Sequence, residues 1–207
     1  MSRPITTILL FFSLTLQGQK SINLKNPSFE DKIKCCDPPI GWYNCGPSEE
    51  SPTDVQPGMF QVTLPASDGS TYLGMVVRDN NTVEAVGQRL SEPLVAGKRY
   101  RLNVALARSE IYLSYSRITG KEANFATPVL LRVWGSSRGK CDKDEMLYQT
   151  PLITTTHWKD YELILEPQKA NCTYLILEAS YSTQTPEALS YNGNLLLDNL
   201  SLQALEY

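Results

Sequence analysis

The chain has 207 residues, with 19 lysines and arginines against 22 aspartates and glutamates, and a net charge of −3. Its basic residues are scattered along the sequence, which argues against nucleic acid as a partner, because a nucleic-acid site needs a clustered basic surface. Beyond residue 18 no second long apolar run follows, so we expect no membrane span, which needs about 20 apolar residues.

Residues 1–18 have the pattern of a secretory signal peptide. Arg3 supplies a short basic start, Ile5 to Leu16 form an apolar run broken only by threonine and serine, and Gly18 is a small residue at the cleavage point. We expect this segment to be removed and residues 19–207 to fold as a single β-sandwich domain. The mature protein is then expected to be secreted, either extracellular or at the periplasmic or outer surface.

Residues 31–57 form a long irregular segment that we expect to be pinned by cysteine. The chain has five cysteines: Cys35, Cys36, Cys45, Cys141 and Cys172. Export permits disulfides, and the odd count leaves at least one thiol unpaired or available to another chain. The sequence does not fix the pairing, although Cys35 or Cys36 could close a short loop to Cys45. Zinc at these three is disfavoured, because their spacing is not C-x2-C.

Most of the remaining chain is predicted to be β-strand, because no window keeps a helical apolar stripe while several segments alternate with period two. The clearest strand places Tyr100, Leu102, Val104 and Leu106 on one face. Further strands are predicted at 59–63, 72–78, 82–90, 128–134, 158–166, 172–181 and 195–204. Asp79-Asn80-Asn81 is predicted to join two of them as a tight hairpin. This many short strands predict an all-β fold, a β-sandwich of jelly-roll type.

Two patterns typical of enzymes do not meet the requirements of catalysis. Gly135 to Gly139 match G-x-S-x-G with Ser137 at the nucleophile position, but the charged residues that follow do not form the helix that this motif requires. Glu162 and Glu166 share a strand face about 13 Å apart, farther than the ~5–9.5 Å between the carboxylates of glycosidases. We therefore expect a protein without catalytic activity.

Aromatic and planar polar residues suggest a carbohydrate ligand. Sugars stack on aromatic faces and are bound through paired hydrogen bonds from arginine or carboxylate groups. The candidate ligand-binding residues are Arg78, Arg108, Tyr112, Tyr115, Arg132, Trp134, Glu178, Tyr181 and Tyr191. The alternative for each aromatic residue is packing in the core. The segment 109–127, which contains Tyr112 and Tyr115, is predicted to form a rim.

A structural calcium ion is predicted where the first and last strands meet. Glu30 and Asp198 supply the two carboxylates, and backbone carbonyls around Asn26 and Ser28 supply further oxygen ligands. The alternative is that Glu30 and Asp198 cap turns or accept hydrogen bonds from backbone N–H groups.

Several segments resemble one family of domains. They are Asn26–Glu30 (NPSFE), Gly41-Trp42, LSEPLVAGKRY at 90–100, RLNVALARS at 101–109, Trp158–Tyr161 and LLLDNLSL at 195–202. Together they resemble the galactose-binding-like β-sandwich shared by many carbohydrate-binding modules, including domains of secreted bacterial proteins. The resemblance implies a secreted jelly roll with a structural calcium ion, and places Glu30 and Asp198 at its calcium carboxylates.

We therefore expect a secreted, non-catalytic carbohydrate-binding module that binds a glycan or polysaccharide at the cell surface or in the extracellular matrix. The alternative is a structural or adhesion domain without a sugar site, which binds a protein partner such as a cell-surface protein. An open patch around Arg78, Arg108, Arg132 and Trp134 would favour the first. A face filled by residues 109–127 would favour the second.

Overall fold

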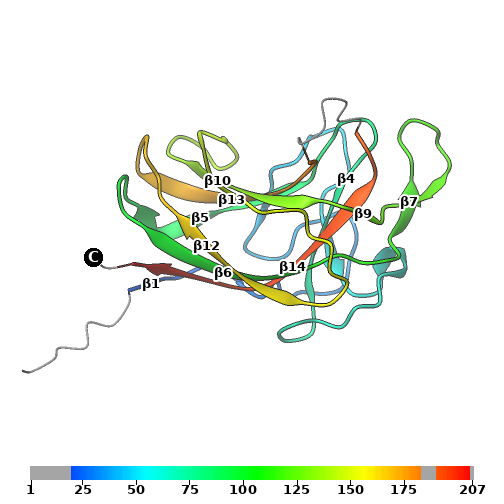
Figure 1. The fold of residues 1–207 in the computed structure, drawn as a ribbon, viewed down its shortest axis with the longest axis horizontal. Helices are drawn as coiled ribbons and strands as arrows, with labels where there is room; N and C mark the ends of the chain where they lie inside the picture. The colour runs from blue at the N-terminus through cyan, green and yellow to red at the C-terminus, as the bar shows by residue number, and fades with distance from the viewer. Residues whose placement is uncertain (1–19, 183–189, 206–207) are drawn as a thin grey trace, which may run out of the picture.

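The computed structural model describes residues 20–182 and 190–205, which form two β-sheets packed as a sandwich (Figure 1). This arrangement confirms the predicted all-β sandwich. The expected signal peptide, residues 1–18, lies outside the described residues. Within the described part of the chain, no helix has the length and apolar character needed to cross a membrane.

Sheet A contains both ends of the described chain. Its strands run in the order β12 (Lys159–Leu165), β6 (Tyr100–Ala107), β14 (Gly193–Ala204), β4 (Tyr72–Val77) and β3 (Asp54–Gln56). Two short strands also pair with β14: β1 (Ser21–Ile22) in antiparallel and β9 (Thr127–Pro128) in parallel orientation. The C-terminal strand therefore lies in the middle of the sheet (Figure 1).

Sheet B forms the second layer. Its strands run in the order β11 (Glu145–Gln149), β10 (Leu130–Ser136), β13 (Cys172–Ser180), β5 (Ala85–Leu94) and β2 (Tyr43–Asn44). A separate hairpin of β7 (Leu113–Tyr115) and β8 (Glu122–Asn124) extends from one end of the sandwich (Figure 1).

The main core lies between the sheets and follows from alternation along each strand. On β14, Leu195 and Leu197 face inward, where they join Leu106 of β6 and Val133 of β10. A leucine buried in this way contributes about 1.5–3 kcal/mol to folding. The intervening Leu196 packs on the opposite face of the sheet, in a second apolar cluster.

The second cluster shows that the 109–127 segment covers part of the outer face of sheet A. Tyr112 and Phe125 are buried there against Val76 and Leu196. The predicted rim is therefore partly a core element, because these two aromatic rings find apolar side chains on the outward side of β4 and β14.

One local prediction is wrong. Residues 59–63 contain a short 3-10 helix, η1 (Met59–Gln61), because left-handed φ angles of 53° at Phe60 and 62° at Gln61 turn the chain instead of extending it. The predicted Asp79–Asn81 hairpin is confirmed: Val77 and Val83 form an antiparallel bridge, and the Arg78 N–H donates to the carbonyl oxygen of Thr82 at 2.9 Å. Beyond this hairpin the chain crosses from one layer to the other, because β4 lies in sheet A and β5 in sheet B.

A buried ionic network lies beside this turn. Arg78 is only 2% exposed and forms ion pairs with Glu84, which is equally buried, and with Glu50. Burial raises the pKa of Glu84, while Arg78 acts in the opposite direction. Asp54, on the neighbouring strand β3, accepts a hydrogen bond from the hydroxyl of Tyr112. Arg78 therefore neutralises acidic groups that water cannot reach.

Replacing Arg78 by methionine should lower the free energy of unfolding by ~3–5 kcal/mol, because Glu84 then stays buried without its cation. The matched control is Arg101→Met. Arg101 pairs with Glu162 at the surface, where the side chains are 28% and 55% exposed, and its loss should cost less than about 1 kcal/mol. Urea denaturation at neutral pH measures the free energy of unfolding of both variants. Equal losses of stability would contradict the role of Arg78 as the buried counter-ion of Glu84.

Candidate functional site

Three of the predicted ligand-binding residues meet on the outer face of sheet B. Arg132 and Trp134 are two residues apart on β10 and therefore point to the same side of the sheet. The strand register places Arg132 opposite Glu178 of β13. The inward positions between them are apolar, as Val133 and Leu177 show. Core packing thus fixes which side these three polar and aromatic residues face.

The Glu178 carboxylate is the centre of this group. Trp134 donates its indole N–H to Glu178 Oε1 at 3.3 Å, and Arg132 Nη1 lies 3.9 Å from the same oxygen. Lys143 forms an ion pair with the other oxygen of Glu178. Arg132 also donates from Nε to Gln149 Oε1 at 2.9 Å. We call these five residues the Glu178 cluster.

Lys143 and Gln149 are members of the cluster that sequence reasoning missed. Gln149 lies on β11, which pairs with β10 opposite Arg132. Lys143 lies in the loop 137–144 between those strands. The pairing of β10 and β11 is the signal that could have found them, because a polar segment after Ser136 followed by the apolar run Met146–Tyr148 indicates a second strand.

A disulfide between Cys45 and Cys141 holds the loop 137–144 against sheet B. At Gly87 of β5, an added Cβ would lie 2.9 Å from Cys45 Sγ and 3.0 Å from the carbonyl oxygen of Lys140. Only glycine leaves room for this close approach. The structure thus resolves the pairing that the sequence left open, and Cys45 bonds to neither Cys35 nor Cys36.

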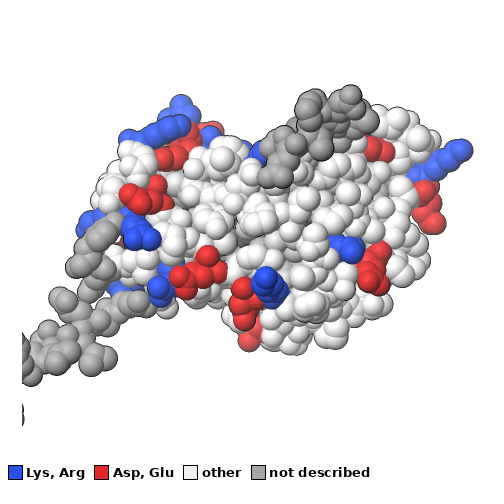
Figure 2. Space-filling view, viewed as in Figure 1, with Lys and Arg blue, Asp and Glu red and all other residues white. Residues whose placement is uncertain are grey.

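The Glu178 cluster offers hydrogen-bonding groups around a half-buried aromatic ring. Glu178 is 4% exposed, whereas the side chains of Arg132 and Lys143 are 21% and 30% exposed. The carboxylate is therefore shielded, and the donors around it remain within reach of a ligand. Figure 2 shows lysines and arginines interspersed with acidic residues on the visible face, without a basic stripe.

The other predicted ligand-binding residues lie elsewhere. Tyr181 and Tyr191 pack edge to face with ring centroids 5.3 Å apart, and the Tyr181 hydroxyl bonds to the carbonyl of Thr82 at 2.9 Å. They support the turn after β4, next to the buried Arg78. Tyr112 is 1% exposed inside the second apolar cluster. Neither Arg78 nor Tyr112 reaches a surface where a ligand could touch it.

Arg108 and Tyr115 are on the surface but apart from the Glu178 cluster. Arg108 donates to the carbonyl oxygens of Thr154 at 3.1 Å and Ala126 at 3.2 Å. It lines a groove of about 230 Å³ beside Glu110. Tyr115 is 59% exposed at the β7–β8 hairpin. The structure therefore brings together three of the nine predicted residues.

Asp198, one of the two predicted calcium ligands, is fully buried in β14. Its carboxylate accepts backbone N–H bonds from Ser67 at 2.8 Å, Asp68 at 2.9 Å and Asn199 at 2.8 Å. The Ser28 hydroxyl oxygen lies 3.0 Å from Asp198 Oδ1. Burial raises the pKa of Asp198, and these hydrogen bonds act against that rise. The residue ties the C-terminal strand to the turn 67–71.

Glu30 binds the other half of the same turn. Its Oε1 accepts backbone N–H bonds from Ser70 at 2.8 Å and Thr71 at 3.1 Å. The Ser28 hydroxyl lies 2.8 Å from Asp68 Oδ2 as well as 3.0 Å from Asp198. The Ser28 hydroxyl has only one proton to donate, so it can donate a hydrogen bond to only one of the two carboxylates. The other carboxylate oxygen could accept a cation instead.

Asp68 is an acidic residue of this site that the sequence analysis missed.

No protein-family model matches the sequence, and no curated protein does. Several solved structures do match the structure of this chain. The K2 cleaved adhesin domain of Lys-gingipain has a TM-score of 0.53 at 11% identity, with 87% of this chain and 97% of that one covered. The CBM22-1 xylan-binding domain of Xyn10C from Paenibacillus barcinonensis has a TM-score of 0.50 at 13% identity, with 92% and 99% covered.

A bacteriophage CBA120 tailspike protein 4 domain has a TM-score of 0.49 at 12% identity; the match covers 80% of this chain but only 20% of the tailspike chain. At these identities the likeness concerns the fold. The adhesin and xylan-binding domains confirm the resemblance that the sequence indicated: the chain has the β-sandwich fold found in carbohydrate-binding modules and adhesin domains.

Proposed function

We propose that this protein is a non-catalytic carbohydrate-binding module that binds a glycan or polysaccharide on the outer face of sheet B. The observation that carries the proposal is the convergence of Trp134, Arg132 and Glu178 on that face. An indole ring offers a flat surface to the C–H groups of a sugar. A guanidinium group pairs with neighbouring hydroxyls, and the shielded Glu178 carboxylate holds Arg132 and Lys143 in position.

The position of the 109–127 segment supports this proposal over a purely structural domain. The segment packs on the outer face of sheet A, through Tyr112 and Phe125, and so leaves the Glu178 cluster uncovered. The loop 137–144 lies on sheet B instead and brings Lys143 to Glu178. It therefore adds a polar group to the proposed site.

A binding role also fits the surroundings of Ser137, the residue at the nucleophile position of the G-x-S-x-G pattern. Its hydroxyl and backbone N–H both bond to Asp144 Oδ2, at 3.2 and 3.0 Å. The segment then continues into β11, whereas a nucleophile elbow continues into a helix. We propose that Ser137 is a turn residue.

We propose that the protein acts outside the cytoplasm, at a cell surface or in the extracellular matrix. Two observations support this: the signal-like pattern of residues 1–18 and the disulfide between Cys45 and Cys141. Disulfides persist in oxidising compartments and are rare in reducing ones.

Residues 19–207, screened against a panel of glycans and polysaccharides, should bind at least one of them. Trp134→Ala should then weaken binding by about tenfold or more, because the stacking surface is lost. Glu178→Gln should weaken it too, by releasing Arg132 and Lys143 from their positions. The matched control is Tyr115→Ala, which removes an exposed ring far from the cluster. Folded protein that binds nothing on the panel would favour the protein-binding alternative.

We also propose a calcium ion near Ser28, held by Asp68 and Asp198 with help from Glu30. The support is that two carboxylates, Asp68 and Asp198, share the single hydroxyl proton of Ser28. Calcium prefers oxygen ligands such as these. The ion would fix the N-terminal segment to β14. Hydrogen bonds alone are the alternative, since both predicted carboxylates already accept N–H groups of the turn 67–71.

Thermal melts in calcium and in chelator separate these alternatives. Calcium at a hundredfold excess over its Kd should raise Tm by about 5–10 °C, and Asp68→Asn should remove that response. Asp37→Asn is the control, because Asp37 is an exposed acid outside the site. Asp198→Ala is not diagnostic, since it leaves backbone donors unpaired and destabilises the fold by at least ~2 kcal/mol in either case. If the unmodified protein melts at the same temperature in calcium and in chelator, it has no structural calcium site.

A further inference from the structure

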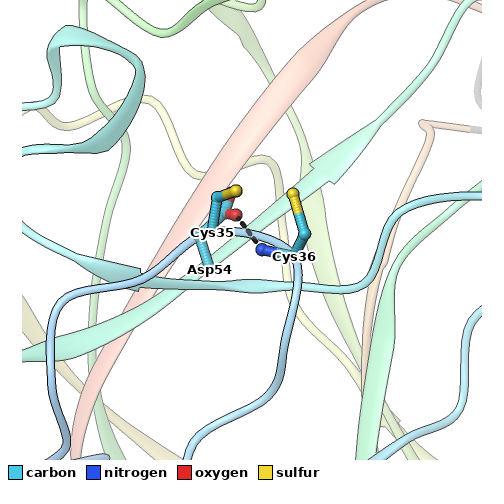
Figure 3. A group of neighbouring side chains, drawn as sticks. All are labelled: Cys35, Cys36 and Asp54. Atoms are coloured by element: carbon cyan, nitrogen blue, oxygen red, sulfur yellow. Dashed lines mark hydrogen bonds between the residues drawn. The ribbon is translucent and has the colours of Figure 1, made fainter.

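Cys35 and Cys36 lie against Asp54 at the edge of sheet A. The preceding residue, Lys34, pairs with Val55 through backbone hydrogen bonds of 2.9 and 3.3 Å in both directions. The Cys36 N–H then donates to Asp54 Oδ1 at 2.9 Å (Figure 3). Backbone pairing therefore holds the two thiols beside the carboxylate, independently of any ligand.

The backbone at Cys36 brings both thiols to one side. Neighbouring side chains on an extended strand point in opposite directions. Cys36 has a left-handed φ of 67°, which breaks that alternation. Figure 3 shows the two sulfur atoms on the same side of the chain, next to Asp54. The two sulfurs and a carboxylate oxygen lie within 4.8 Å of one another, the only such group of three or more His, Cys, Asp or Glu residues in the described part of the chain.

We propose that Cys35, Cys36 and Asp54 form a three-ligand site for a thiophilic divalent cation of the zinc class, with one coordination position left for water or another ligand. Thiolate sulfur and carboxylate oxygen are ligands that zinc accepts in tetrahedral sites. The zinc arrangement disfavoured in the sequence had Cys45 as its third ligand. In the structure Cys45 is bonded to Cys141, and Asp54 takes that position.

Metal ions bind thiolates rather than thiols. Binding one divalent ion replaces two thiol protons, which pass to the solvent, and forms two metal–sulfur bonds.

Other groups fix the ligands in place. Asp54 is 4% exposed and also accepts the hydroxyl of Tyr112, a second bond of the kind that orients metal ligands. Among the described cysteines, Cys172 is buried in the main core and Cys45 is paired with Cys141. No third thiol is therefore near enough to draw Cys35 or Cys36 into another disulfide.

Cadmium is the direct probe, because its bonds to thiolates give an ultraviolet charge-transfer band. Residues 19–207 are treated with a mild reductant, and mass spectrometry verifies that Cys45 and Cys141 stay paired while Cys35 and Cys36 are free thiols. Titration with Cd²⁺ should then saturate at one ion per chain with a band for two thiolates. Excess Zn²⁺ should abolish that band by displacement.

Variants locate the site. Cys35→Ser and Cys36→Ser each alter exposed residues and should each lose about half of the band and weaken binding by about tenfold or more. Asp54→Asn should keep the band and lower the affinity; its melting curve checks that the buried substitution leaves the fold intact. Asp37→Asn, an exposed neighbouring acid, should change neither.

Two results would overturn the proposal. One is the absence of stoichiometric binding by protein whose two thiols are verified free. The other is a band unchanged in the double variant Cys35→Ser/Cys36→Ser, which would place the ion elsewhere. Both serine variants avoid the core, so a failure to bind can be read without a loss of folding.

Discussion

The placement of β14 in the middle of sheet A is the constraint on which the rest of the structure depends. This strand hydrogen-bonds to β6 along one side and β4 along the other, and β1 joins it as well. Its inward leucines complete the main core, and its outward Leu196 anchors the second cluster. Its Asp198 accepts the N–H groups of Ser67 and Asp68 from the turn 67–71. One twelve-residue strand thus connects both cores to the N-terminal segment.

The two outer faces of the sandwich differ in character because different loops cover them. On sheet A, aromatic residues of the 109–127 segment cover the apolar part of the face over β4 and β14. On sheet B, a charged loop tied by the disulfide brings Lys143 to Glu178 and leaves Arg132 partly exposed. A covered apolar surface stabilises the fold, and a polar face with an aromatic ring is suited to recognition. The division arises from loop composition, since both sheets alternate in the same way.

The strands of the sandwich could be predicted because their alternation is local. Tyr100 to Leu106 show it directly, and β6 forms there. Phe60 could not be placed, since nothing in its neighbours indicates a left-handed φ of 53°. Tyr112 was assigned to a surface because its burial depends on β4 and β14, far away in the chain. Asp54 was overlooked for the same reason: its proximity to Cys35 and Cys36 arises only from the pairing of Lys34 with Val55.

The disulfide between Cys45 and Cys141 also determines how the molecule responds to tension. The bond joins residues 96 apart in sequence, and the strands β3 to β10 lie within the closed loop. When the chain is pulled from its ends, this loop cannot lengthen, and roughly 320 Å of contour stays inaccessible at about 3.3 Å per residue. Only the flanking segments, which include β1 and β11 to β14, can be drawn out. A tether built on this domain would therefore extend far less under load than its residue number suggests.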